Sequence, residues 1–515
     1  MPLKNDADVV LAAFDNLSEA DKANEATLRA FVDEHFTAPG TELEESLPED
    51  FNSNPNSFDR IQDPVYREWA LDLHAKWPVL CRKISDKVKS QPERYTLIDV
   101  PHPFIIPGGR FREFYYWDSY WIVKGLLASQ MHLTAKNMIR NLASMVERFG
   151  FVPNGGRIYY LNRSQPPTLS LMVESYYYAT LEEKFIMEML PLLEKEMMFW
   201  RENRSVEWPQ DGESFTFYHY NVTPNGPRPE SYREDMETAR LASDDCKERD
   251  RAYSELASAA ESGWDFSSRW FDYTPEHPHR GTLRSIRTSQ LIPVDLNALL
   301  CNQLKILARF HEIVGDSVMG ERRKLEFERM RAAFNKCFWN EKAGVWFDLD
   351  LATGKQTERF YASNIWPLYL LCDNGDKVTG RKVAEYLRNS GANDDFPGGI
   401  PNSMVNSGQQ WDAPNGFANL NHMVIEGLRK CGEAELAFEL AEKWIRTNYF
   451  AYKESGMIPE KFNVESAQGE AGGGGEYEVQ GDRRAGFAWT NGVVLDLLTT
   501  YGDRLRAPIT EKEKS

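Results

Sequence analysis

The 515-residue sequence has no apolar run that approaches the roughly 18 consecutive residues needed to cross a membrane. Residues 1–22 combine a short apolar run with acidic neighbours, so they predict an amphipathic helix and not a signal peptide. The six cysteines lie far apart and form no Cys-x-x-Cys pair. This spacing disfavours both a disulfide framework and a zinc site.

Signature motifs of several protein classes are also missing. The nine histidines are scattered without a His-Glu-x-x-His pair, and no Gly-x-Ser-x-Gly elbow is present. The glycines at 472–475 are not followed by Gly-Lys-Ser/Thr, which excludes a Walker-type phosphate loop. The 60 basic and 78 acidic residues give a net charge of −18, a surface that would repel nucleic acids and anionic lipids. The expected partner is therefore small or neutral.

What the sequence does contain is material for a large helical core. Hydrophobic residues make up 42% and aromatic residues 12% of the chain, which is typical of a globular protein. Apolar residues at helical spacing over 296–314 precede Gly315, and a second amphipathic stretch follows over 321–338. Similar stretches occur near 120–150, 168–202, 361–390, 417–447 and 486–501. Short loops between such helices favour antiparallel hairpins, and about six in succession predict an all-α, closed toroid of helical hairpins.

The remaining segments suggest how the chain is divided. The run Val345–Leu349 before the turn at 352–354 is the clearest strand signal and predicts a minor β-hairpin. We expect residues 1–60 to form an N-terminal helical segment and tether, residues 61–505 the toroid, and residues 506–515 a charged tail. Long loops between the helix pairs are where we expect function to concentrate.

Four of these loops mix charged and amide side chains with aromatic rings. They cover residues 107–121, 153–165, 228–230 and 408–416. Each can be interpreted as packed rings with structural ion pairs. Alternatively, each binds sugar, because aromatic rings stack on the C–H faces of sugars while arginines and carboxylates bind vicinal hydroxyls. The recurrence in four loops favours sugar binding.

Two further loops carry carboxylates or glycines in suggestive positions. Asp265 follows Gly263 and lies between two large aromatic residues, surroundings that raise a carboxyl pKa as a general acid near neutral pH requires. A helix N-cap is the alternative interpretation of Asp265. Residues 466–485, with their glycine run, predict a lid that closes over a site, and a flexible linker is the alternative.

Two long blocks carry a resemblance to a known family. PGGRFREFYYWDSYW at 107–121 and QWDAPNGFAN at 410–419 closely resemble the two signature motifs of trehalases, a family of inverting glycoside hydrolases. PNGGRIYYLNRSQPP, RPESYRED, ESGWDFSSRW and GGGGEY are similar to other segments of that family, in the same order. The resemblance spans about residues 60 to 500 and implies an (α/α)6 toroid.

The resemblance also implies the roles of individual residues. It assigns Asp265 as the catalytic acid and Glu460, in PEKF, as the catalytic base. The chain departs from the family at Phe417, Asn419 and Phe462, where Trp, Pro and Tyr are usual. The implied sugar pocket is lined by Arg110, Phe111, Trp117, Asp118, Asn154, Arg163, Gln165, Arg228, Glu230, Gly263, Trp411 and Glu476.

The activity that the family implies is hydrolysis of α,α-trehalose by water to two glucose molecules, with inversion and without a metal or organic cofactor. Two alternatives stay open. Another toroidal glucosidase acting on longer α-glucans would need an open cleft, and a trehalose-binding sensor would lack the acid or the base.

The resemblance to animal, and especially insect, trehalases predicts a secreted or membrane-associated full-length form with trimmed ends here, and a cytoplasmic protein is the alternative. Sequons at Asn16, Asn162, Asn203 and Asn221 support secretion only weakly. We expect a monomer that binds no nucleic acid.

Overall fold

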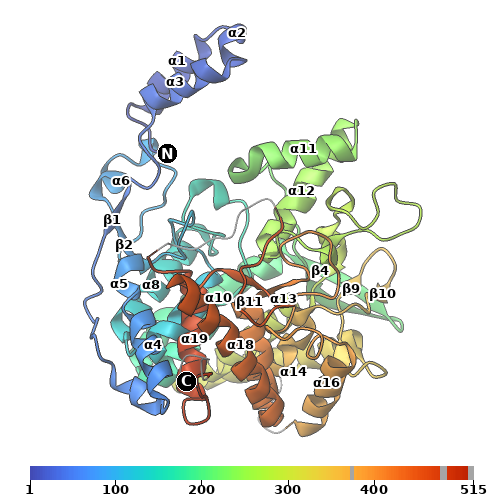
Figure 1. Ribbon diagram of the computed structural model, residues 1–515. Coiled ribbons are helices and arrows are strands. Elements are labelled where there is room, and N and C mark those ends of the chain that lie inside the picture. Colours follow the sequence, from blue (N-terminus) through green and yellow to red (C-terminus); the bar gives the residue numbers. More distant parts are fainter. Residues whose placement is uncertain (372–375, 476–483, 509–515) are drawn as a thin grey trace.

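The structure is a computed structural model that describes residues 1–371, 376–475 and 484–508. Helices dominate it, with short strands between them (Figure 1). None of the helices in these ranges combines the length and the hydropathy that a membrane span requires. The helices are α1 (Ala7–Asp15), α2 (Glu19–Lys22), α3 (Glu25–His35), α4 (Pro64–His74), α5 (Trp77–Leu80), α6 (Asp86–Ser90), α7 (Asp118–Ala128), α8 (His132–Phe149), α9 (Leu169–Thr180), α10 (Glu183–Asn203), α11 (Tyr232–Ala242), α12 (Cys246–Ser262), α13 (Val294–Ile313), α14 (Ser317–Phe338), α15 (Trp366–Leu370), α16 (Lys377–Asn389), α17 (Ala418–Lys430), α18 (Ala434–Ser455) and α19 (Ala488–Thr500).

Six helices of the described chain form a closed inner ring. Helix α7 contacts α9, α9 contacts α13, and the ring continues through α15, α17 and α19 back to α7. The outer helices α8, α10, α14, α16 and α18 each follow an inner helix in the chain, and α4 packs outside α19. Because each outer helix returns the chain to the same end, the inner helices run parallel. This is the predicted (α/α)6 toroid.

Two glycines allow the first and last inner helices to meet. A Cβ atom on Gly125 of α7 would lie 2.4 Å from Cα of Gly492 in α19. A Cβ atom on Gly492 would lie 2.2 Å from the carbonyl oxygen of Trp121. Neither position has room for a side chain, so the two backbones touch and the ring closes here.

The predicted end of the helix over 296–314 is confirmed. Gly315 follows α13 in the left-handed conformation, with φ +84°, as expected for a glycine that ends a helix. Helices α11 and α12 were not predicted from the sequence. Their segment is highly charged and the buried face of α12 is rich in alanine, so the pattern of apolar residues is weak there. Helix α12 begins at the N-cap Asp245, whose carboxylate accepts hydrogen bonds from two backbone amides, and it ends at Gly263.

The strands are short and pair in antiparallel fashion. The expected turn at 352–354 joins β9 to β10, but the strand predicted over Val345–Leu349 is broken: Val345–Trp346 form β8, which pairs with β7, and Leu349 begins β9. The hairpin of β4 and β5 is longer and was not predicted, although Asp211-Gly212 between alternating residues is a hairpin signal. The strands are β1 (Leu43–Glu45), β2 (Cys81–Ile84), β3 (Phe104–Ile105), β4 (Ser205–Gln210), β5 (Glu213–Tyr218), β6 (Leu291–Ile292), β7 (Trp339–Asn340), β8 (Val345–Trp346), β9 (Leu349–Asp350), β10 (Lys355–Gln356), β11 (Asn415–Phe417) and β12 (Lys461–Asn463).

The N-terminal helices α1 to α3 project away from the toroid, as Figure 1 shows in dark blue. The residues that follow them are packed on the body: β1 pairs with β2, Glu42 forms a buried ion pair of 2.7 Å with Arg157, and Phe58 lies in the core. The stretch expected to be a tether is therefore largely part of the body. Of the expected C-terminal tail, residues 509–515 lie outside the described residues.

Candidate active site

The loops that precede several inner helices enclose a cavity of about 260 Å³. Much of its lining comes from segments just before α7, α9, α17 and α19, which the parallel inner helices bring to one end of the ring. The segment before α11 and the turn that ends α12 complete it. Glu476, the one predicted site residue that is missing from the lining, lies outside the described residues. The other thirteen all line the cavity: Arg110, Phe111, Trp117, Asp118, Asn154, Arg163, Gln165, Arg228, Glu230, Gly263, Asp265, Trp411 and Glu460.

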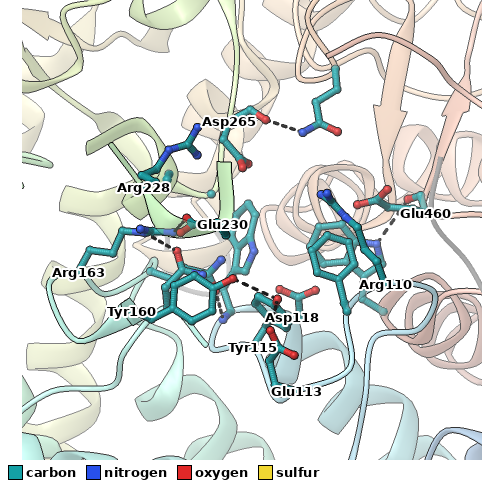
Figure 2. A pocket seen from close by; sticks show the side chains of 18 of the residues that line it. Arg110, Glu113, Tyr115, Asp118, Tyr160, Arg163, Arg228, Glu230, Asp265 and Glu460 are labelled. Atoms are coloured by element: carbon teal, nitrogen blue, oxygen red, sulfur yellow. Dashed lines mark hydrogen bonds and ion pairs between the residues drawn. The ribbon is translucent and has the colours of Figure 1, made fainter. Parts of the chain in front are cut away.

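Figure 2 shows how the charged side chains enter this cavity. Asp265 and Glu460 reach it from different segments of the chain, and Asp118 reaches it from the start of α7. Both carboxyl groups lie in buried surroundings. Glu460 is only 8% exposed, and Trp264, the residue before Asp265, is fully buried. The cavity is thus a polar pocket whose charged side chains are largely buried.

A tight turn after α12 places Asp265. Gly263 has φ +76°, and a Cβ atom there would lie 2.5 Å from the indole ring of Trp117. The backbone carbonyl of Asp265 accepts a hydrogen bond from Nε2 of Gln410, and the carbonyl of Phe266 accepts one of 3.1 Å from the amide of Trp411. The turn is therefore held from both sides, which fixes the origin of the Asp265 side chain.

Asp412, in the second signature block, holds the residues that follow Asp265. Its carboxylate accepts hydrogen bonds from the Ser267 hydroxyl at 2.8 Å, the Ser268 amide at 2.6 Å and the Ser403 hydroxyl at 2.7 Å. Burial raises the pKa of Asp412, and these donors oppose that shift. A fully bonded buried carboxylate of this kind ties two loops into one rigid unit.

Glu460 is placed by the last inner helix and by a small sheet. Its backbone carbonyl accepts a 3.4 Å hydrogen bond from the indole of Trp489, and the carbonyl of Pro459 accepts one of 3.0 Å from Thr490. The next residue, Lys461, begins β12, which pairs with β11 of the second signature block. The sheet brings the segment of Glu460 beside the block at 410–419, about 40 residues earlier in the chain.

Five carboxyl side chains line this cavity, and the pKa values of two of them, Asp118 and Asp265, are raised. Burial raises the pKa of Asp265 to about 6, although Arg228, Arg110 and Arg163 oppose the shift. Burial, then the charges of Glu460 and Asp265, raise the pKa of Asp118 to about 8. A carboxyl group in such a site can donate a proton near neutral pH, which is what a general acid does.

Arg163 and Glu230, which both line the cavity, form a largely buried ion pair. Nη2 of Arg163 binds Oε1 of Glu230, and its Nε donates 2.9 Å to the side-chain oxygen of Asn154. Within the described residues, Nη1 of Arg163 and Oε2 of Glu230 are buried without a hydrogen-bond partner. Buried polar atoms are normally bonded, so these two indicate places for ligand hydroxyls.

Two further ion pairs lie at the edge of the cavity, each with one partner in the lining. Arg228 forms a forked pair with Asp235, with contacts of 2.6 and 3.0 Å, while its guanidinium lies 5.0 Å from the centre of the Phe266 ring. Glu113 pairs with Arg157, at 3.3 Å. Asp235 therefore orients Arg228 toward the cavity from behind.

Two of the three positions at which the sequence departs from the family are phenylalanines, and neither lines the cavity. Phe417 stacks on Trp411, with ring centres 3.9 Å apart and planes 3° from parallel, so Phe417 supports the wall from behind. Phe462 is fully buried and packs edge-on against Trp444 at 5.3 Å, away from the cavity lining. The substitutions at these two positions leave the lining itself aromatic.

Several lining residues were not among the predicted site residues. Most lie within the segments already recognised by their aromatic and polar composition, but Phe487 and Trp489 start α19, where no local pattern marks them. The additional lining residues are Glu113, Tyr115, Tyr159, Tyr160, Ala260, Gln410, Phe487 and Trp489. No group of three His, Cys, Asp or Glu side chains within the described ranges has a metal-holding arrangement.

The glycine run that predicted a lid is held to the site loops over its described part. The amide of Gly472 donates 3.0 Å to the carbonyl of Lys461, and the amide of Gly475 donates 3.1 Å to that of Gly408. The carbonyl of Gly473 accepts 2.7 Å from Asn415. Residues 476–483 of the expected lid lie outside the described residues.

Comparison with known proteins places the chain in one family. The trehalase family matches residues 1–502. A trehalase of Oryctolagus cuniculus is 45% identical over 511 residues, covering 98% of this chain and 86% of that protein. The human trehalase is 43% identical over 510 residues, covering 98% and 85%. A trehalase of the wasp Pimpla hypochondriaca is 42% identical over 504 residues, covering 96% and 84%.

Solved structures support the fold. Neutral trehalase Nth1 from Saccharomyces cerevisiae superposes with a TM-score of 0.61 at 21% identity, covering 80% of this chain and 79% of that one. A GH63 mannosylglycerate hydrolase from Thermus thermophilus gives a TM-score of 0.51 at 16% identity, covering 76% and 95%. Such distant similarity carries the fold alone, whereas the sequence matches carry the family: this chain belongs to the trehalase family.

Proposed function

We propose that this chain hydrolyses α,α-trehalose to two molecules of glucose with inversion at the attacked anomeric carbon. The observation that carries the proposal is the cavity in which Asp265 and Glu460 lie with three arginines and aromatic side chains. Membership of the trehalase family supports the same reaction.

In the proposed reaction, Asp265 donates a proton to the oxygen that bridges the two glucose units. Its raised pKa, about 6, lets the carboxyl hold that proton close to neutral pH. Glu460 removes a proton from a water molecule, which attacks the anomeric carbon from the opposite face. An inverting enzyme needs its two carboxyls about 6.5–9.5 Å apart so that this water fits between them.

The remaining cavity residues bind the sugar hydroxyls in this proposal. Arg163 and Glu230 offer the buried atoms that have no partner among the described residues, and a hydroxyl can donate to the carboxylate and accept from the guanidinium. Asp118, with its pKa near 8, offers a protonated carboxyl that can donate as well as accept. The rings of Trp117 and Trp411 provide apolar faces for the sugar.

Both alternative functions fit the site less well. A glucosidase acting on long chains needs an open cleft, whereas this cavity is small and walled by loops. A sugar sensor without catalysis has no need for a pair of carboxyls, one of which has a pKa raised toward neutrality.

The test is to incubate the protein with trehalose and follow the products by NMR. Inversion turns the attacked glucose into the β-anomer and releases the other as the α-anomer, so early product contains equal amounts of both. Only α-glucose would refute inversion, and no glucose at all would refute the hydrolase.

We further propose a monomer whose partners are trehalose and water, in a protein of the secretory pathway. The four sequon asparagines are all exposed, at Asn16, Asn162, Asn203 and Asn221. Mass spectrometry of peptides from the native host would reveal glycans at these sites, and their absence from all four would favour the cytoplasmic alternative. Light scattering across protein concentrations would test the monomer.

A further inference from the structure

A buried lysine lies next to the proposed catalytic base. Lys461 follows Glu460 directly and is fully buried, and its ammonium group lies 5.9 Å from the centre of the Phe417 ring. Burial lowers the pKa of Lys461, and the charges of Glu460 and Asp265 oppose that shift. A buried charge is costly, so a lysine at this position calls for a reason beyond packing.

The ammonium group is hydrogen-bonded to a glutamine that also holds the proposed acid. Nζ of Lys461 donates 2.8 Å to Oε1 of Gln410, and Nε2 of Gln410 donates to the backbone carbonyl of Asp265. Gln410 is only 7% exposed, and its own backbone carbonyl accepts 3.0 Å from the side chain of Asn415. The side chains of Lys461 and Gln410 thus link residue 461, next to the proposed base, to the backbone carbonyl of the proposed acid Asp265.

The direction of this bridge is determined by its chemistry. An ammonium group can only donate, so the glutamine must turn its oxygen toward Lys461 and its NH2 group toward the Asp265 carbonyl, which can only accept. Glutamate at position 410 would still accept from Lys461 but could not donate to Asp265. The bridge therefore requires an amide, and this requirement can be tested.

We propose that Gln410 and Lys461 are positioning residues that set the separation and orientation of Asp265 and Glu460. The proposal rests on the function proposed above, in which the two carboxyls act on opposite faces of one anomeric carbon. Displacement of a catalytic group by about 1 Å can cost about a hundredfold in rate. Within the bridge, Lys461 also provides a cation beside Glu460, which favours the ionised base.

The experiment compares steady-state kinetics of the wild type with Lys461→Met and Gln410→Glu. Both variants should lose about a hundredfold in kcat with a smaller change in KM, because the carboxyls and not the sugar contacts are displaced. The double variant Lys461→Met/Gln410→Glu should be no slower than the worse single variant, since both changes break one bridge.

A matched control separates positioning from stability. Lys443 of α18 is also a lysine whose pKa is lowered by burial, and its Nζ donates 3.1 Å to the side-chain oxygen of Asn393, outside the cavity. Lys443→Met should lower the melting temperature and leave kcat unchanged. If Lys461→Met does the same, Lys461 is a structural residue and the proposal is wrong.

The pH profile provides a readout that a merely structural role would not change. The charged groups around Glu460 are Lys461, Arg110, Asp118 and Asp265. Removing the cation at 461 should raise the pKa of the base and move the low-pH limb of kcat/KM upward by about one unit or more. An unmoved limb in Lys461→Met, with kcat close to that of the wild type, would overturn the proposal.

If Lys461→Met does not fold, Gln410→Glu decides alone, because it keeps the bond to Lys461 and removes only the donor to Asp265. Retention of wild-type kcat in Gln410→Glu would overturn the bridge. Failure of the wild type to release glucose from trehalose would instead refute the proposed function, and the bridge proposal with it.

Discussion

Asp118 and Glu460 line the same cavity, and burial together with the charge of Glu460 raises the pKa of Asp118 to about 8. A free aspartate has a pKa of about 3.9. The folded protein therefore keeps a proton on Asp118 at neutral pH that the unfolded chain gives up. The folded structure therefore disfavours the ionised form of Asp118, and this lowers the stability of the protein at neutral pH.

We expect Asp118→Asn to stabilise the protein. Between about pH 4 and pH 8 the folded state binds one proton more than the unfolded state, so stability due to Asp118 falls as pH rises. Asparagine removes this dependence, and the gain should grow from nothing near pH 4 to about 4 kcal/mol at pH 7. Denaturant melts across this pH range measure it, and an equal or lower stability at pH 7 would contradict the raised pKa.

Asp496 provides the opposite case in the same fold. Burial would raise its pKa, but Lys124 at 3.2 Å and His422 at 2.9 Å outweigh burial and hold the pKa well below its usual range. Asp496→Asn should therefore destabilise the protein by about 1.5–3 kcal/mol at pH 7, because it removes the carboxylate that pairs with the half-buried ammonium group of Lys124. The difference from the wild type should shrink as pH falls below about 4, where the unfolded chain binds the proton more readily.

We expect Asp265→Asn and Glu460→Gln each to fold and to lose several orders of magnitude in kcat. Each change removes one proton transfer while it keeps the size of the side chain. In the wild type, kcat/KM should fall as pH rises above about 6, because Asp265 must be protonated to act as the acid. Near-normal turnover of either variant would refute the role of that residue.

Arg163→Lys should lower kcat/KM by about a hundredfold, because a single ammonium group cannot replace a fork that binds Glu230, Asn154 and a ligand together. Arg287→Lys is the matched control: Arg287 forms a forked pair with Asp350, at 2.8 and 2.9 Å, outside the cavity. The control should lose only thermal stability. Equal kinetic effects in both variants would argue against a binding role for Arg163.

Gly263→Ala should reduce activity strongly, because its Cβ atom would displace the indole of Trp117 and the turn that carries Asp265. Gly150→Ala is the control, since Gly150 also ends a helix with φ +88° but has open space at its Cβ position. Both changes should cost about 1 kcal/mol of stability for the left-handed conformation. Only Gly263→Ala should lower kcat, as measured by glucose release.

The division of the chain can be tested by truncation. A chain that starts at residue 37 loses the projecting helices and the exposed ion pair of Asp6 with Arg94, so it should keep its activity with only a small fall in melting temperature. A chain that starts at residue 61 also loses Glu42 and Phe58, leaves Arg157 without one buried carboxylate, and should unfold at lower temperature. Equal stability of the two truncated chains would mean that residues 37–60 are a passive tether.

Local patterns in the sequence determined the helices and most of the site. The spacing of apolar residues over 296–314 and the glycine at 315 predict the α13–α14 hairpin, because both signals act within one or two helical turns. The composition of the charged aromatic loops favours sugar binding, and the resemblance to trehalases selects Arg110, Arg163 and Trp411 within them. The carboxyl at 265 is also visible locally, because its two aromatic neighbours are adjacent in the chain.

Only the tertiary structure decided which of these groups meet, and in what state of protonation. Asp118, Asp265 and Glu460 lie more than a hundred residues apart in sequence, and the parallel inner helices bring them to one end of the toroid. The raised pKa of Asp118 depends on burial and on charges from two other segments, so no local pattern contains it. The bridge from Lys461 through Gln410 to Asp265 likewise joins three segments, because electrostatic and hydrogen-bond interactions depend on distance in space and not on distance along the chain.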